Sequence, residues 1–181
     1  MEEPVRSTPS YVVRLARPDE AGQVCEVCTE GFTASSQGLL SPATIRRQVE
    51  TYYTPERVRQ DIVTAAEREA WQGYVVAVTD DGEVLGAAGG GVVSEGTGQI
   101  YALYLGMALR GRGIGSALVD FLTEQQKRLG AVEQGVSVTE GNDLGLPFYL
   151  AKGFVMKDRV PFVSDDEGNV EAWSLRLVRA I

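Results

Sequence analysis

Two arginines and three glycines alternate in the segment 110–115, which reads Arg-Gly-Arg-Gly-Ile-Gly. An apolar, strand-like stretch precedes the segment, and apolar residues at helical spacing follow it. Glycine has no Cβ, so successive backbone N–H groups there can approach a ligand closely. The first N–H groups of a helix lack partners, and the helix dipole makes that end positive. With the charges of Arg110 and Arg112 added, the segment predicts a binding site for a phosphate or pyrophosphate.

At these residues the sequence resembles the GCN5-related N-acetyltransferase family. The signature of that family is Arg/Gln-x-x-Gly-x-Gly/Ala, placed after a strand that ends in an apolar-Tyr-apolar triplet. Segment 110–115 matches the signature in full, and residues 103–105 supply the triplet as Leu-Tyr-Leu. Met107 stands where the family often has proline. The resemblance is specific over residues 100–154 and concerns only the architecture elsewhere.

A second block of the family pattern follows at the expected distance and contains Asn142, Phe148-Tyr149 and Lys152-Gly153-Phe154. The resemblance implies that the glycine loop binds the diphosphate of coenzyme A. It also implies that the strand before the loop binds the pantetheine arm through its backbone. The cofactor-binding residues implied are Leu103, Tyr104, Leu105, Arg110, Gly111, Arg112, Gly113, Ile114, Gly115, Ser116 and Asn142.

Transfer of an acetyl group from a thioester to an amine requires a proton for the leaving thiolate. In the family, a tyrosine at the position of Tyr149 acts as this general acid. Taken by itself, Tyr149 is better explained as a half-buried aromatic on a short helix, and the glycine loop is what favours the catalytic role. Asn142 either bonds the pantetheine amides, as the resemblance implies, or caps the following helix. Lys152 either meets a phosphate or is a solvated charge.

The base that accepts the proton of the amine is not identified by the sequence. Many relatives place a glutamate on the fourth or fifth strand, but the matching position here is Ser137. Glu30, Glu95 and Glu140 lie near loops within reach of the site, and nothing selects among them. A chain of water molecules, or an amine deprotonated in solution, would also suffice.

The elements around these residues predict an α/β fold. Residues 1–9 are expected to be flexible, and residues 10–181 to form a single N-acetyltransferase domain. The resemblance implies a central mixed sheet of about six to seven strands, flanked by helices, in which parallel strands four and five splay apart. We expect strands at 11–15, 74–78, 84–93, 99–105, 135–139, from 154 and at 172–178, and helices at 18–32, from 41, from 54, after 115 to about 130 and at 145–151.

Three regions of the chain bear on substrate choice. The stretch 31–41 is small and polar and predicts a loop, and we expect its part 32–40 to help select the acceptor. The hairpin near 162–169 and Tyr101 are expected to contribute as well. Alternation along strand four predicts one face made of Gln99, Tyr101, Leu103 and Leu105.

The stretch 86–91 is a run of glycines and alanines within a predicted strand. The Gly-Lys-Ser/Thr ending of a phosphate loop is absent, so close approach of a neighbouring segment or a β-bulge explains it better. Cys25 and Cys28 are the two cysteines, and the chain has no histidine. They share one face of a predicted helix, so we expect buried packing residues rather than a metal site.

The composition of the 181-residue chain limits the function classes. Its net charge of −8 argues against binding nucleic acid or an acidic membrane. The acidic surface favours a cationic substrate or simply serves solubility. No apolar run has membrane-spanning length, and the N-terminal residues lack a signal-peptide pattern, so we expect a cytoplasmic protein.

The sequence thus predicts an acetyl-CoA-dependent N-acetyltransferase that needs no metal. Its acceptor is expected to be the amine of a small molecule or peptide, and the resemblance allows a homodimer. A coenzyme A-binding module without catalysis is the alternative, because the usual carboxylate is missing. Dinucleotide binding is a further alternative, but the spacing is G-x-G-x-G rather than G-x-G-x-x-G.

Overall fold

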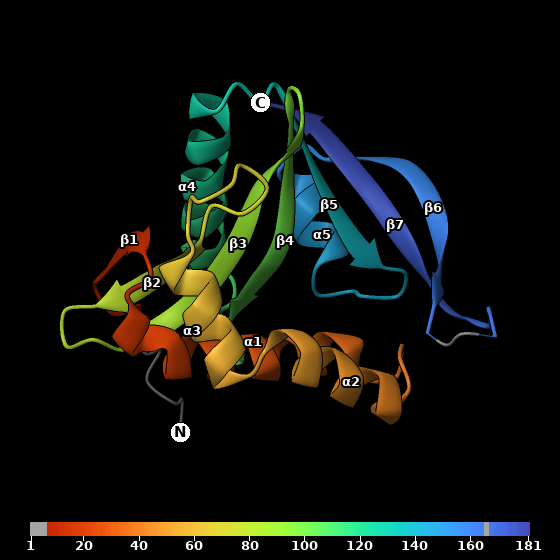
Figure 1. Cartoon of the computed structure of the whole chain (residues 1–181), viewed down its shortest axis with the longest axis horizontal. Helices are drawn as coiled ribbons and strands as arrows, with labels where there is room; N and C mark the ends of the chain where they lie inside the picture. Colours follow the sequence, from red (N-terminus) through yellow and green to blue (C-terminus); the bar gives the residue numbers. More distant parts are fainter. Residues whose placement is uncertain (1–6, 165–166) are drawn as a thin grey trace.

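The computed structural model describes residues 7–164 and 167–181, which form a seven-stranded sheet with helices on both faces (Figure 1). Predictions for residues 1–6 and 165–166 lie outside the described residues. The strands are β1 (Tyr11–Leu15), β2 (Tyr74–Thr79), β3 (Val84–Ser94), β4 (Thr97–Leu105), β5 (Glu133–Thr139), β6 (Val155–Val163) and β7 (Val170–Ala180). The helices are α1 (Ala21–Ser36), α2 (Pro42–Tyr52), α3 (Pro55–Val63), α4 (Ile114–Arg128) and α5 (Leu146–Ala151), with short 3-10 turns at Pro18–Glu20 and Met107–Leu109.

The sheet has the order β1-β2-β3-β4-β5-β7-β6. Within the described chain, β4 and β5 form the parallel pair and the other neighbours are antiparallel. The parallel pairing covers only residues 97–100 of β4 and 133–136 of β5. Beyond it the two strands diverge, as Figure 1 shows. The predicted mixed sheet with a splayed parallel pair is therefore confirmed.

Two hydrophobic clusters cover opposite faces of the sheet. Successive side chains of a strand point to opposite faces, and β2 divides in this way between the clusters. Val75 and Ala77 pack with residues of α4 and α5, whereas Val76 and Val78 pack with residues of α1 and α3. The opening between β4 and β5 is thus flanked by a helical layer on each face.

One extra residue in β4 interrupts the alternation. Gly89 pairs with Ala102 and the next residue, Gly90, pairs with Ile100, so Tyr101 is left over as a β-bulge. Because of the bulge, Leu103 packs in the same cluster as Ile100, beneath α4. The predicted single face of Gln99, Tyr101, Leu103 and Leu105 is therefore wrong.

Helix α1 is longer than expected, and the predicted loop at 31–41 is wrong in its first half, because α1 continues to Ser36. Gly31 is not a turn residue. A Cβ there would stand 2.6 Å from Cβ of Tyr104, so the glycine allows α1 to lie directly on β4. The predicted starts of α2 and α3 are confirmed, since Ser41 and Thr54 cap them from the positions before proline.

Close approach explains the small residues of β3, as expected. The segment 69–72 continues alongside this strand through hydrogen bonds from Val92 N to Glu69 O and from Gln72 N to Gly90 O. A Cβ at Gly91 would stand 2.2 Å from Ala70 O, and one at Gly89 would stand 2.8 Å from the Trp71 ring. The glycines therefore fix where Trp71 lies.

Both cysteines pack in the cluster beneath α1 and α3, as predicted. The Cys25 thiol donates to the carbonyl oxygen of Tyr53, and burial raises the pKa of the Cys28 thiol. Within residues 7–164 and 167–181, no helix combines the length and apolar character needed to span a membrane.

Candidate functional site

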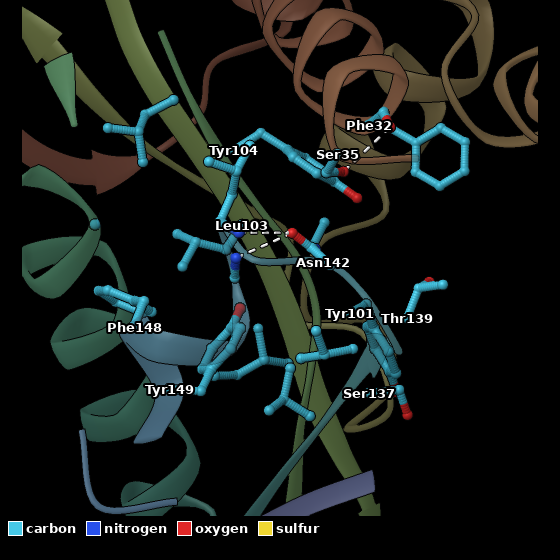
Figure 2. Close-up of a pocket in the computed structure, with 18 of the residues that line it drawn as sticks. Phe32, Ser35, Tyr101, Leu103, Tyr104, Ser137, Thr139, Asn142, Phe148 and Tyr149 are labelled. Atoms are coloured by element: carbon cyan, nitrogen blue, oxygen red, sulfur yellow. Dashed lines mark hydrogen bonds between the residues drawn. The ribbon is translucent and has the colours of Figure 1, made fainter. Parts of the chain in front are cut away.

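A cavity of about 1130 Å³ lies where β4 and β5 diverge. Its walls include Ile114 and Tyr149 from the α4–α5 face of the sheet, and Tyr53 and Trp71 from the α1–α3 face. Figure 2 shows side chains from both layers converging on it. The predicted site residues that line it are Leu103, Tyr104, Leu105, Arg110, Gly111, Gly113, Ile114, Gly115, Ser116, Asn142 and Tyr149, whereas Arg112 is not among the lining residues.

The glycine loop opens one end of this cavity. Gly111 and Gly113 have φ of +74° and +84°, a left-handed conformation that favours glycine. Gly113 is the N-cap of α4, and no side chain caps the helix there. A Cβ at either glycine would meet no atom within 4 Å. The N–H groups of the first turn of α4 therefore lie at the positive end of the helix dipole without a capping side chain.

Arg110 lies in the wall of the cavity beside this loop. Its Nε is buried and has no hydrogen-bond partner among the described residues. A buried donor without a partner costs free energy of about 1–3 kcal/mol, and an anion bound at the loop would satisfy it. The donor set, which combines backbone N–H groups with a guanidinium, fits a diphosphate.

The edge of β4 that faces β5 is open beyond Ile100. Residues 102–105 remain paired with β3 on the other side, and residues 137–139 of β5 remain paired with β7. No pairing joins these two stretches to each other in the described chain. Their backbone groups are therefore available to an extended ligand, as in the addition of a strand to a sheet edge.

Tyr149 is buried under the cavity and is held by its ring. It packs edge-on against Phe148 and Phe154, with ring centroids 5.1 and 5.4 Å away. Burial raises its pKa well above the ordinary value, so the phenol stays protonated at neutral pH. Its hydroxyl has no hydrogen-bond partner in the described part of the chain. In Figure 2 the hydroxyl points away from α5 and into the cavity.

Asn142 stabilises the turn before α5, which is one of the two roles expected from its position in the sequence. Its Oδ1 accepts hydrogen bonds from the backbone N–H groups of Leu144 and Gly145, at 3.2 and 3.0 Å, and so shapes the turn into α5 (Figure 2). Its Nδ2 stays available as a donor on the cavity wall. Lys152 lies outside the cavity lining, and its Nζ is 3.6 Å from a carboxylate oxygen of Asp120.

The three glutamates near the loops do not line the cavity. Arg159 binds both carboxylate oxygens of Glu140, at 3.0 and 2.7 Å, and these hydrogen bonds lower its pKa. Glu95 lies in the turn between β3 and β4, at the opposite end of β4 from the cavity. Glu30 is exposed on α1. Among described residues of the lining, the carboxylates are Asp61 and Asp143.

Tyr101 lines the cavity as expected, but the other aromatic and charged residues of the α1–α3 face were not predicted from the sequence. Trp71 stacks on Tyr101 with ring centroids 6.3 Å apart, and it packs edge-on against Tyr74 at 5.0 Å. The Tyr101 hydroxyl donates to Ala70 O at 2.8 Å, and Trp71 Nε1 donates to Asp61 O at 2.7 Å. The glycines of β3 were the sequence feature that could have predicted this wall, because they indicate that another segment packs closely on that strand.

The expectation for the acceptor segments is corrected in part. Phe32, Ser35 and Ser36 do line the cavity, but from the last turns of α1 rather than from a loop. No described residue of 162–169 lines it. The hairpin instead docks on α2, where the Glu171 carboxylate accepts hydrogen bonds from the Ser41 N–H and from the Thr44 hydroxyl.

Comparison with known proteins agrees with this geometry. The pattern of the acetyltransferase (GNAT) family matches residues 42–154, which is more than half of the chain. No curated protein matches the chain.

Several solved structures share the fold. The PaiA N-acetyltransferase of Thermoplasma acidophilum, in complex with coenzyme A, is 19% identical with a TM-score of 0.78, covering 95% of this chain and 99% of its own. Ard1 of Thermoplasma volcanium is 20% identical with a TM-score of 0.67, covering 94% and 97%. The ribosomal-protein-alanine N-acetyltransferase of Brucella melitensis is 16% identical with a TM-score of 0.63, covering 94% and 99%.

The open glycine loop, the splayed strands and the family match lead to one assignment. The chain belongs to the acetyltransferase (GNAT) family.

Proposed function

We propose that the protein transfers the acetyl group of acetyl-CoA directly to a primary amine, with Tyr149 as the general acid. The observation that carries the proposal is that buried Tyr149 lines the cavity between β4 and β5 with a hydroxyl that has no hydrogen-bond partner in the described chain. The proposal also agrees with the coenzyme A named for the Thermoplasma acidophilum relative.

The cavity residues divide the binding of acetyl-CoA among three groups. The loop from Arg110 to Ser116 holds the diphosphate through backbone N–H groups and the Arg110 guanidinium. The open edge at 103–105 accepts the pantetheine arm as a further strand. Asn142 adds one donor through Nδ2, since its Oδ1 is already occupied in the turn.

Two groups of the chain act on the reacting atoms. Backbone N–H groups beside the bulge at Tyr101 lie where the strand edge is open, and they stabilise the negative charge that develops on the carbonyl oxygen. Tyr149 keeps its proton at neutral pH because burial raises its pKa, and it delivers this proton to the leaving thiolate. The amine reaches the site neutral, after losing its proton to water or in solution.

Calorimetry and kinetics test the proposal together. The protein should bind coenzyme A and acetyl-CoA with measurable heat, and it should release free thiol from acetyl-CoA only when a suitable amine is present. Gly113→Val forces a β-branched residue into a left-handed conformation and blocks the loop, so it should abolish the heat of binding. Gly168→Val places the same change at a positive φ far from the cavity and serves as control. Absence of binding to either form of the cofactor would refute the proposal.

A binding module without catalysis is the second candidate. It is favoured by one observation: no carboxylate of β4 or β5 is present in the described lining of the cavity. Tight binding of coenzyme A without thiol release, across a panel of amines from pH 7 to about 9, would decide for this candidate. Turnover that rises with pH would decide for the enzyme, because a neutral amine is the attacking species.

A further inference from the structure

The acceptor side of the cavity carries an excess of positive charge. The charged side chains in this part of the lining are Arg57, Asp61 and Arg68. Arg57 Nε donates to both carboxylate oxygens of Asp61, at 3.1 and 3.0 Å, so this pair is neutral as a unit. Tyr53 and Tyr74 add no charge, because burial raises the pKa of both phenols. Arg68, an exposed residue between Glu67 and Glu69, is left without an ion-pair partner in the described lining.

The guanidinium of Arg68 is unengaged. Within the described chain it makes no hydrogen bond and no ion pair, and only its backbone is held, by the bridge to Trp71. It lines the cavity together with Tyr101 of the β4 bulge. Burial raises the pKa of the Tyr101 phenol, and the positive charge of Arg68 opposes this shift. The Arg57 Nη2 also has no hydrogen-bond partner in the described residues. The Arg68 guanidinium and Arg57 Nη2 are therefore available to bind an anionic group.

Beside Arg68 the wall is flat and aromatic. The stacked rings of Trp71 and Tyr101 are fixed by hydrogen bonds to backbone carbonyls, so they form a rigid surface. Their packing leaves Tyr101 about half exposed, with 47% of its surface accessible. Such a surface takes an apolar or aromatic body and orients it at low entropic cost.

We propose that the acceptor amine also carries a carboxylate, which Arg68 binds while the apolar part of the molecule lies against Trp71 and Tyr101. This inference rests on the acetyl transfer proposed above and names its substrate class. The planar fork of a guanidinium matches the two oxygens of a carboxylate. In this proposal the amine lies at the bulge of β4, since Arg68, Trp71 and Tyr101 line the same cavity.

In this proposal the charge of Arg68 inside the cavity outweighs the acidic charge of the whole surface. The net charge of −8 favours a cationic acceptor from a distance. A diamine without an anionic group, however, would place its second ammonium beside the Arg68 guanidinium and be repelled. The nearby Asp61 carboxylate cannot attract that ammonium, because Arg57 already neutralises it. The same aromatic rings would otherwise attract it through cation–π contacts, so a diamine is the informative competitor.

The test compares amino acids with their decarboxylated amines. The pairs are phenylalanine with 2-phenylethylamine, tyrosine with tyramine and leucine with isopentylamine, with putrescine as the diamine. For at least one pair, we expect kcat/KM of thiol release to be about tenfold or more higher for the amino acid than for its decarboxylated amine. A hydrogen bond between Arg68 and the carboxylate contributes free energy of that order. Arg68→Gln should remove that difference through KM and leave the KM for acetyl-CoA unchanged. Arg46→Gln removes an exposed arginine outside the cavity and should change neither value.

A binding measurement separates this inference from the proposed function. Trp71 and Trp173 are the two tryptophans, so Trp71 fluorescence in Trp173→Phe reports on the aromatic wall without requiring turnover. With coenzyme A bound, the amino acids should change this signal, and Arg68→Gln should weaken the response about tenfold. Amino-acid binding without thiol release would refute the transfer and keep the carboxylate site. A higher kcat/KM for putrescine or the decarboxylated amines than for the amino acids would overturn the inference. So would an equal fall in kcat/KM for all substrates in Arg68→Gln, or Trp71 fluorescence that no amino acid changes.

Discussion

Gln126 of α4 donates a hydrogen bond through Nε2 to the carbonyl oxygen of Gln99, at 3.1 Å, one residue before the pairing of β4 with β5 ends. Its Oε1 accepts a hydrogen bond from Gln134 of β5, at 3.0 Å. One fully buried side chain therefore joins both strands from beneath. Gly98 makes room for it, because a Cβ there would stand 2.1 Å from Gln126 Oε1.

Replacing Gln126 should weaken this junction. Gln126→Leu removes both hydrogen bonds and leaves the Gln99 carbonyl without that donor, so we expect the free energy of unfolding to fall by about 1–3 kcal/mol. Denaturant unfolding followed by circular dichroism measures it. Glu124→Gln, at an exposed position on the same helix, should change it by less than about 0.5 kcal/mol. Equal stability of the two variants would show that the junction is unimportant.

The glycine at 89 should matter for the acceptor more than for the cofactor. Gly89→Ala places a Cβ 2.8 Å from the Trp71 ring as it now lies, so the ring must shift. We expect KM for the acceptor to rise several-fold and stability to fall by about 1–3 kcal/mol, with KM for acetyl-CoA unchanged. Gly22→Ala meets no neighbouring atom and is the matched control. Unchanged acceptor kinetics would contradict the role assigned to this glycine.

Tyr149→Phe should lower kcat by about 100-fold or more, the range typical of general acids. Its effect on the heat of coenzyme A binding should be small, because the ring packing is preserved. Burial raises the pKa of Tyr149, so the wild-type phenol stays protonated and kcat should not decline on the alkaline side through pH 9. Stopped-flow and steady-state thiol release report both quantities. Tyr11→Phe, outside the cavity, is the control; full activity of Tyr149→Phe at every pH would remove the acid role.

The contact between the β6–β7 hairpin and α2 should depend on pH. Partial desolvation of Glu171 opposes ionisation, but hydrogen bonds from Ser164, Ser41 and Thr44 outweigh it and lower the pKa to about 2. A lowered folded-state pKa gives stability that is present above the ordinary value of 4.5 and is lost as pH falls toward about 2. Wild type should therefore melt at a higher temperature than Glu171→Gln at pH 7, and this gap should shrink below pH 4.5.

Glu50→Gln serves as the control for that comparison, since Glu50 is exposed on α2 and its side chain makes no hydrogen bond in the described chain. It should leave the melting temperature nearly unchanged at either pH. A gap between wild type and Glu171→Gln that stays constant from pH 7 to pH 3 would show that the carboxylate does not hold the hairpin.

The glycine loop and the order of elements were predictable because their signals are local. Left-handed glycines at 111 and 113 before an amphipathic helix define a cradle within a few residues. The family resemblance then supplied the splayed pair, which local patterns do not specify. Site roles proposed for Tyr149 and Asn142 remain predictions, although both residues lie in the cavity wall.

What the sequence did not reveal depends on contacts between distant segments. The bulge at Tyr101 is set by pairing with β3, and it changes which side chains share a face. A glycine such as Gly31 is typical both of a loop and of a helix packed closely on a strand. Only the position of Tyr104 in the fold shows that the second explanation applies. Trp71 reaches the cavity because β3 has no side chains beneath the ring. The periodicity of either segment alone does not reveal this contact, because it depends on how the two segments pack together.

The opening between β4 and β5 has a kinetic consequence. Its walls come from both faces of the sheet, so the proposed function predicts that the acetyl donor and the amine approach from opposite faces. The proposal therefore predicts a ternary complex, in which neither substrate has to leave before the other binds. Cys25 and Cys28 do not line the cavity in the described part of the chain, and the proposed transfer uses neither thiol as an intermediate acceptor.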